Sequence, residues 1–478
     1  MFADSLAAAA AAAPPGGGWG VALATGDAAT SFAPAGARTR SVFVARSGDP
    51  QIDETALAVE RRGARGGARI ELLSGTRAGA GAFGRAGRHR WGLDAWGRRG
   101  AHRLETGFVQ AGAATSLASG EGQDASAGAG FARWRWSDRS AWAAAGIERA
   151  YSAHESFAAF FAASRRDAED ERAWAAGGRG LGGGSVAARL EVSRARVRRD
   201  ADPAFDRTAR GVWGGVRVAR TVGDGTLELD AGGGRHGRLG GAFAPALRYR
   251  VAHGAVAACA AVERLVSPVW SDLAPGTVPF LQDTWALRME SAWSRPGAHA
   301  ALGGLVGRTA DRALVARLPI EDLWLRLGAA RDAGRWDFAL LSGSASWSGR
   351  ALGAGAEGFA LARDRRAAQA RVDPAAGLRA WGEWRGTFFA GDLGVRLRLE
   401  GAGVGERESE AAAPRRLAPY LTWGATLALT LADATVFVRA RNLEDRIREQ
   451  AWVDLATGRE ALGAGRTVET VLVWRLFD

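Results

Sequence analysis

Several features that would carry chemistry are absent from this sequence. A single cysteine, Cys259, excludes an intrachain disulfide and a Cys-rich zinc site. The six histidines are scattered and form no HExxH or His-x-His pair. We find no Gly-x-Ser-x-Gly motif and no Ser/His pair at suggestive spacing, and a covalent hydrolase needs such a nucleophile and base. The sequence therefore predicts no catalytic residues, no metal site, no cofactor and no enzyme activity.

Long apolar runs are also missing. No stretch approaches the ~20 consecutive apolar residues that a membrane-spanning helix needs. The short apolar run from Leu6 to Ala13 has no basic residues before it and is followed by Pro14-Pro15 and glycines, so it is a poor secretory signal. We interpret residues 1–50, rich in Ala, Gly and Pro, as a low-complexity leader or a truncated remnant.

None of the 63 basic residues is a lysine and Asn442 is the only asparagine, a bias typical of a GC-rich genome. The net charge of +12 fits either an arginine-lined lumen that attracts anions or a nucleic-acid binder. A nucleic-acid binder usually gathers its charge in one patch or tail. Here the arginines are spread along the chain, often alternating with Val, Leu or Trp, so we predict no nucleic-acid partner.

From about residue 54 the hydrophobic pattern has a period of two, the signature of a strand whose side chains alternate between two faces. In residues 393–400, one face is Leu, Val, Leu, Leu and the other carries Arg396, Arg398 and Glu400. In residues 421–431, Leu and Trp alternate with Thr, Gly and Ala. Similar alternation surrounds Arg189, Arg217, Arg288 and Arg326.

A soluble sandwich also alternates, but three features favour a membrane barrel. The apolar faces reach the ~9 to 11 residues of a tilted spanning strand. The polar faces carry charges of both signs, as a wet lumen does. The strands repeat with no helical stretch between them. We predict an all-β protein in which residues 51–478 form a membrane-spanning antiparallel outer-membrane β-barrel of about 18–22 strands.

Turns and loops fit the same arrangement, with short turns on one rim and long loops on the other. Gly223-Asp224-Gly225, Pro296-Gly297, Leu431-Ala432-Asp433 and Asp332-Ala333-Gly334 predict tight hairpins. Longer polar segments at about 112–128, 199–209, 268–282, 403–419 and 444–465 predict loops. Residues 167–171, of sequence DAEDE, are interpreted as a solvated rim loop.

Tryptophans predict interfacial girdles, because this ring gathers at the edges of the membrane on outer-membrane barrels. The candidates near strand ends or on outward faces are Trp134, Trp136, Trp347, Trp381, Trp384, Trp423 and Trp474.

The end of the chain is distinctive. Val436, Val438 and Ala440 alternate with Arg439 and Arg441, and Asn442-Leu443-Glu444-Asp445 follows. Gly465-Arg466 then precedes a last strand whose outward face is Val468, Thr470, Leu472, Trp474 and Leu476, with Phe477 on the inward parity. This segment resembles the last strands of the TonB-dependent receptors of the Gram-negative outer membrane, which carry Asn-Leu-Phe-Asp and Gly-Arg at these places. The residues that carry the resemblance are Asn442, Leu443, Asp445, Gly465, Arg466, Trp474 and Phe477.

The resemblance implies an outer-membrane barrel that takes part in ligand uptake, the ligand being a siderophore, cobalamin, saccharide or peptide. It implies outer-membrane lipid and the barrel assembly machinery as partners. No plug is visible before the first strand, so TonB is a partner only if a plug lies upstream, in a sequence that lacks its beginning. The alternative is a plugless relative that acts as a passive, porin-like channel.

Arginine on the lipid face costs about 2 to 4 kcal/mol at mid-membrane, so the alternation should place arginines in the lumen. If they face water there, they favour anionic solutes, and we expect mild anion selectivity. The candidate lumen-facing residues are Arg189, Arg217, Arg288, Arg326, Arg396, Arg398, Arg439 and Arg441.

Overall fold

The structure is a computed structural model of the chain. It describes residues 39–49, 52–78, 83–117, 122–138, 140–158, 161–199, 207–237, 240–269, 280–310, 314–317, 324–327, 335–363, 374–408, 415–446, 449–453, 460–462 and 466–476. Within these ranges, no helix has the length and apolar character needed to cross a membrane.

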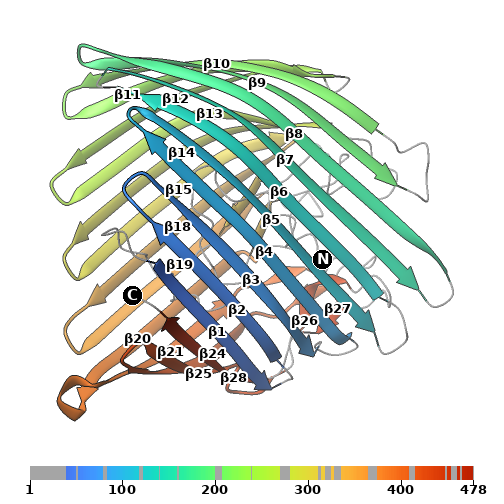
Figure 1. Ribbon diagram of the computed structural model, residues 1–478, viewed down its shortest axis with the longest axis vertical. Coiled ribbons are helices and arrows are strands. Elements are labelled where there is room, and N and C mark those ends of the chain that lie inside the picture. The colour runs from blue at the N-terminus through green and yellow to red at the C-terminus, as the bar shows by residue number, and fades with distance from the viewer. Residues whose placement is uncertain are drawn as a thin grey trace.

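One antiparallel sheet of 22 strands dominates the described residues (Figure 1). Its first half comprises β1 (Thr39–Asp49), β2 (Ile52–Arg62), β3 (Gly66–Ala78), β4 (Phe83–Arg99), β5 (His102–Leu117), β6 (Gly122–Ser137), β7 (Ala141–Ala158), β8 (Phe161–Leu181), β9 (Gly184–Arg199), β10 (Arg207–Val222) and β11 (Gly225–His236). Its second half comprises β12 (Gly241–His253), β13 (Val256–Val269), β14 (Phe280–Arg295), β15 (Ala298–Ala310), β18 (Arg335–Ser348), β19 (Leu352–Arg363), β20 (Ala376–Phe388), β21 (Leu393–Val404), β24 (Tyr420–Leu431), β25 (Ala434–Arg441) and β28 (Thr467–Leu476).

The sheet closes on itself because β1 pairs with both β2 and β28. Closure leaves no edge strand with unpaired amides, which is the condition for a sheet to span a membrane. The predicted all-β antiparallel barrel is therefore confirmed, at the upper end of the expected strand number. The first described strand of the wall is β1, so residues 39–49, which we interpreted as part of the leader, pair with β2 and β28. That strand is needed to fill the gap between β2 and β28.

The two faces of the wall differ as the period of two requires. On β28, Val468 and Trp474 are 40% and 47% exposed, whereas Glu469 and Val471 between them are 4% and 0% exposed. On β21, Leu397 and Leu399 are exposed and Arg398 is buried. On these two strands the exposed apolar side chains lie on the outer face, and Glu469 and Arg398 lie on the inner face.

The two rims also differ. At the turn rim, each even-numbered strand of β2–β14 leads to the next through a few residues, as at Gly223-Asp224 and Pro296-Gly297, where the glycines have positive φ. At the loop rim lie three small hairpins outside the wall: β16 (Leu314–Arg317) with β17 (Trp324–Leu327), β22 (Arg407–Glu408) with β23 (Arg416–Leu417), and β26 (Glu449–Val453) with β27 (Glu460–Leu462). A 3-10 turn, η4 (Phe389–Gly391), joins β20 to β21 at the turn rim. Leu431-Ala432-Asp433 joins β24 to β25 tightly as predicted, with Ala432 at positive φ, while Asp332-Ala333-Gly334 lies outside the described residues.

Wall height varies around the barrel. β7 and β8 have 18 and 21 residues, whereas β25 and β28 have 8 and 10. In Figure 1 the long strands β7 to β9 extend furthest toward the loop rim. Two loop predictions were wrong for this reason. Residues 112–117 and 122–128 lie in β5 and β6, and residues 167–171 lie inside β8. Their polar sequence reflects a wall that rises beyond the apolar band.

Most of the candidate girdle tryptophans lie outward. Trp134, Trp347, Trp384, Trp423 and Trp474 are all more than a third exposed. Trp423 lies near the loop rim, and Trp347, Trp384 and Trp474 lie near the turn rim. Trp381 is an exception: the guanidinium of Arg398 stacks 4.5 Å from its ring centre, on the inner face.

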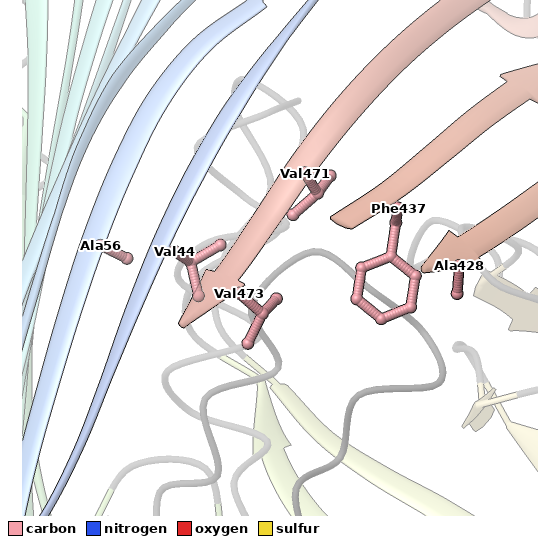
Figure 2. Close-up of a cluster of buried hydrophobic side chains, with 6 residues drawn as sticks. All are labelled: Val44, Ala56, Ala428, Phe437, Val471 and Val473. Atoms are coloured by element: carbon pink, nitrogen blue, oxygen red, sulfur yellow. The ribbon is translucent and has the colours of Figure 1, made fainter. Parts of the chain in front are cut away.

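A cluster of buried apolar side chains marks the place where the barrel closes (Figure 2). It comprises Val44, Ala56, Ala428, Phe437, Val471 and Val473, with Val42 and Leu73 packed against it. Its members come from β1, β2, β24, β25 and β28, so the first and last strands share one packed patch. We call these five strands the seam sector.

Candidate functional site: the charged inner wall

The inner face of the seam sector carries a chain of four buried charges. Arg46 Nη1 lies 3.1 Å from Glu54 Oε2, and Arg46 Nε lies 2.8 Å from Glu469 Oε2. Arg439 Nη1 donates to Glu469 Oε1 at 3.3 Å. These side chains are 4–7% exposed and cross from β2 through β1 and β28 to β25. Because an unpaired buried charge is costly, the alternation of sign ties the first two strands to the last two.

A second network crosses β19, β20 and β21. Arg379 Nη2 donates to Glu400 Oε2 at 2.8 Å, and its Nη1 donates to Glu357 Oε1 at 3.5 Å. Arg398 Nε lies 3.6 Å from the same Glu400 carboxylate. Glu383, itself buried, pairs with Arg385 on its own strand and lies 3.7 Å from Arg396 Nη1 on β21.

A third network alternates in sign across five consecutive strands, β10 to β14. Arg217 Nε donates to Asp230 Oδ1 at 2.7 Å, and Arg248 pairs with both Asp230 and Glu263. Arg288 Nη2 lies 3.0 Å from the other oxygen of Glu263. Each carboxylate thus lies between two guanidinium groups from neighbouring strands.

Arg189 belongs to a smaller group on β8 and β9. Its Nη2 donates to Glu191 Oε2 at 2.7 Å, and its guanidinium lies 5.1 Å from the ring centre of Trp174. Arg441, at the loop-rim end of β25, lies on the same face as Phe437 and Arg439 by strand alternation.

Arg326 is placed differently from the other candidate lumen residues. It lies in β17 opposite Val315 of β16, in a hairpin that is not part of the wall. The alternation of Leu323, Leu325 and Leu327 indicated a wall strand, but β17 has only four residues. A four-residue strand rises about 13 Å, too little to cross a membrane. Period two predicts a strand without showing which sheet it joins.

Sequence reasoning singled out the arginines and missed their partners. The carboxylates that pair with them are Glu191, Asp230, Glu263, Glu383, Glu400 and Glu469. Their alternation within each strand was visible, but the pairing across strands depends on register. The consequence is electrostatic: guanidinium groups held by carboxylates attract mobile anions less strongly than bare ones, so the anion selectivity expected from arginine alone is reduced.

The Asn-Leu-x-Asp corner binds the two ends of the last loop together. Asn442 adopts a left-handed backbone with φ 52°, which asparagine tolerates better than most residues. Its side chain donates to the carbonyl of Arg446 at 2.8 Å. Asp445 Oδ1 accepts a hydrogen bond of 2.7 Å from the backbone N–H of Arg466, directly before β28.

The neighbouring residues of the corner attach it to β24. The Leu443 N–H donates to the Trp423 carbonyl at 3.0 Å, and the Trp423 N–H donates to Glu444 Oε2 at 3.2 Å. The family-like residues around Asn442 therefore have a structural role at the loop rim. Gly465 and Phe477 lie outside the described residues.

A recess of about 740 Å³ lies on the inner wall near the turn rim. Small side chains line it, among them Ala257, Gly303 and Ser342, together with Cys259 and the charged Arg250 and Glu290. Among the described residues no group of three or more His, Cys, Asp or Glu is placed to hold a metal ion.

The closed wall, its apolar exterior and its charged interior define a β-barrel of the outer-membrane type. No protein-family model matches the chain, and no curated protein matches it significantly. Solved structures share the fold at low sequence identity, which is evidence about the fold alone. A point mutant of the ferric enterobactin receptor PfeA of Pseudomonas aeruginosa superposes with a TM-score of 0.72 at 12% identity, over 93% of this chain and 81% of that one.

Two further solved structures match equally well. The FrpB iron transporter of Neisseria meningitidis, in its apoprotein form, has a TM-score of 0.73 at 9% identity, over 92% of this chain and 81% of that one. The siderophore receptor PirA of Acinetobacter baumannii has a TM-score of 0.72 at 7% identity, over 93% and 81%. The barrel fold expected from the resemblance to TonB-dependent receptors is confirmed.

Proposed function

We propose that this chain is the barrel of an outer-membrane receptor of the TonB-dependent type and takes part in ligand uptake across the outer membrane of a Gram-negative cell. The observation that carries the proposal is the closed 22-stranded wall with apolar side chains outside and paired charges inside. The solved structures that share this wall are described as receptors for ferric enterobactin or another siderophore, or as an iron transporter. Ferric chelates are therefore the first ligand class to test.

The partners follow from the same proposal. Outer-membrane lipid contacts the apolar exterior, and the barrel assembly machinery inserts the chain. TonB is a partner if a plug segment accompanies the barrel, because energy coupling acts through the plug. Transport, and not catalysis, is the proposed activity.

A passive channel is the second candidate, because a barrel of this size without a plug leaves a water-filled lumen. The charges on the inner wall fit a wet lumen equally well. Conductance separates the two functions, since only an open lumen passes ions continuously.

The test uses the full chain refolded into liposomes. Binding of a panel of ferric siderophores would be followed by quenching of tryptophan fluorescence, and ion conductance would be recorded across planar bilayers. Saturable binding of one chelate supports the receptor. A large constitutive conductance with no saturable binding supports the channel. Recovery of the chain in buffer after detergent partitioning would refute both.

A further inference from the structure

The outer face of β7 to β10 changes from apolar to charged within one row of residues. Strand register aligns two successive rows across these four strands. The first row consists of Ile147, Ala173, Val192 and Val212. The next row toward the loop rim, which we call the arginine row, consists of Arg149, Glu171, Arg194 and Arg210. The apolar row includes some of the most exposed side chains of the wall, such as Ile147 at 62%.

The position of this change matches the edge of a membrane. On β10, the outward side chains between Arg210 and Arg220 are Val212, Gly214, Val216 and Val218. Ten residues rise about 33 Å along a strand. With a tilt of about 35–45°, this corresponds to roughly 25 Å along the membrane normal, the height of the apolar band on outer-membrane barrels. The arginine row therefore lies at the level of lipid headgroups on the loop-rim side.

The arginine row has more cations than its carboxylate can neutralise. Glu171 serves both Arg149, at 3.4 Å, and Arg194, at 4.0 Å, and all three side chains are at least 40% exposed. Glu169, one row higher, adds a contact of 3.6 Å to Arg149. Arg210 lies beside Arg194 and has no hydrogen bond or ion pair with any residue in the described ranges.

Two outward arginines near the loop rim on other strands are each paired with a carboxylate. Arg264 makes two hydrogen bonds of 2.9 Å to Asp283, and Arg308 makes bonds of 2.6 and 2.9 Å to Asp337. These two-point pairs occupy the guanidinium donors that would bind another anion. Arg194 and Arg210 have no such two-point partner among the described residues, so their guanidinium donors remain available.

We propose that Arg194 and Arg210 bind the phosphate of a phosphorylated glycolipid in the outer leaflet, with Glu171 orienting Arg194. The planar guanidinium donates two parallel hydrogen bonds to phosphate, and its charge balances the anion at the headgroup level. The apolar row below supplies the surface for the acyl chains. The inference rests on the proposed outer-membrane location.

The test measures retention of bisphosphorylated lipid A by the purified full chain in detergent, using native mass spectrometry and a titration. The double variant Arg194→Gln with Arg210→Gln should lose at least tenfold in affinity. The matched control, Arg264→Gln with Arg308→Gln, removes two outward arginines that are already paired and should bind like the parent. Lipid A without phosphate should bind the parent as weakly as it binds the double variant.

Each outcome has a defined meaning. Full affinity in the double variant, or equal loss in the control pair, would overturn the inference. Competition by millimolar inorganic phosphate would show a site for free anion and would also overturn it. Folding of every variant is checked by the shift in electrophoretic mobility between heated and unheated samples. A parent barrel that inserts and binds ferric chelate, but shows no preference for phosphorylated lipid, would refute this inference and leave the proposed function standing.

Discussion

The seam sector and the sector formed by β7, β8 and β9 have different heights on the same barrel. At the seam, β25 ends at Arg441, one residue after its last outward apolar side chain, and the corner at Asn442 begins at once. On β8, strand continues for ten positions beyond Glu171, to Phe161. Ten positions correspond to about 33 Å along the tilted strand, or roughly 25 Å of wall height above the apolar band. We call β7, β8 and β9 the tall sector.

The two sectors hold their charges differently. In the seam sector, the four charges lie on the inner face, are nearly inaccessible and form one chain of alternating sign. In the tall sector, the charges just above the apolar band lie on the outer face, are exposed and are incompletely paired. The difference indicates two roles for arginine. At the seam, buried arginines join the first and last strands of the sheet through ion pairs. On the tall sector, exposed arginines face the medium outside the barrel.

The largest expected effect tests the seam. Glu469→Ala leaves the guanidinium groups of Arg46 and Arg439 buried without their shared partner, which should cost about 3–5 kcal/mol of unfolding free energy. Urea unfolding of the barrel in micelles, followed by electrophoretic mobility, measures the loss.

Glu171→Ala is the matched control in the tall sector. Its carboxylate also serves two arginines, but all three groups are exposed, and exposed pairs contribute about 0–1 kcal/mol. Equal losses in the two variants would show that the contrast between the sectors is not energetic.

The second prediction tests the level of the apolar band on one strand. Val216→Arg places a charge on the outer face of β10 at mid-band and should cost about 2–4 kcal/mol. Thr208→Arg places the same charge on the same face, above the arginine row, and should be close to neutral. Unfolding free energies in lipid vesicles measure both. A neutral Val216→Arg would move the membrane boundary away from the arginine row.

The third prediction concerns the corner at the low end of the seam sector. Asp445→Ala removes the acceptor of the Arg466 N–H and should cost about 1 kcal/mol, the usual net value of such a hydrogen bond. Hydrogen exchange of the Arg466 amide should accelerate, because the last loop is no longer tied to the start of β28. Unchanged exchange at Arg466, with the fold intact, would show that the loop is held by other contacts.

The sequence predicted the barrel well because the apolar alternation of period two holds across the part of each strand that lies in the apolar band. The outward set Leu421, Trp423, Leu427, Leu429 and Leu431 is on the face expected from alternation. The predicted ends of strands were wrong where a polar stretch was interpreted as a loop, as at residues 167–171. A strand above the membrane has no apolar face, and only its partners in the sheet identify it as a strand.

The sequence predicted which charged residues face the lumen, but it did not predict how they pair across strands. Alternation put Arg217 and Asp230 on inward positions of their own strands, but their pairing depends on a register fixed by the two-residue turn between β10 and β11. The chain of four buried charges in the seam sector could not be predicted. Arg46 and Glu469 are separated by most of the sequence and come into contact only because the barrel closes. Asn442 and Asp445 were recognised by resemblance, and their hydrogen bonds supply the physical reason for the pattern.

The smallest expected effect lies at the turn rim, between β6 and β7. Asp138 accepts hydrogen bonds of 2.7 Å from the backbone N–H groups of Ser140 and of Ala141, which hold the pKa of its carboxyl below the usual range. The carboxylate therefore orders the turn above the ordinary aspartate pKa of 3.8, and this ordering is lost as pH falls through the lower folded value. The amide signals of Ser140 and Ala141 should shift together in that acidic window.

Asp138→Asn supplies the control for that titration, because the amide oxygen keeps an acceptor for the two N–H groups but carries no titrating charge. Its turn should stay ordered at acidic pH, with no shift of the Ser140 and Ala141 amides. The four buried charges of the seam sector should not titrate in the same pH window, since they lie on the inner face of other strands and share no contact with Asp138. Simultaneous loss of the turn and of the closed barrel in the same pH window would mean that acid opens the whole wall, and that this turn has no local equilibrium of its own.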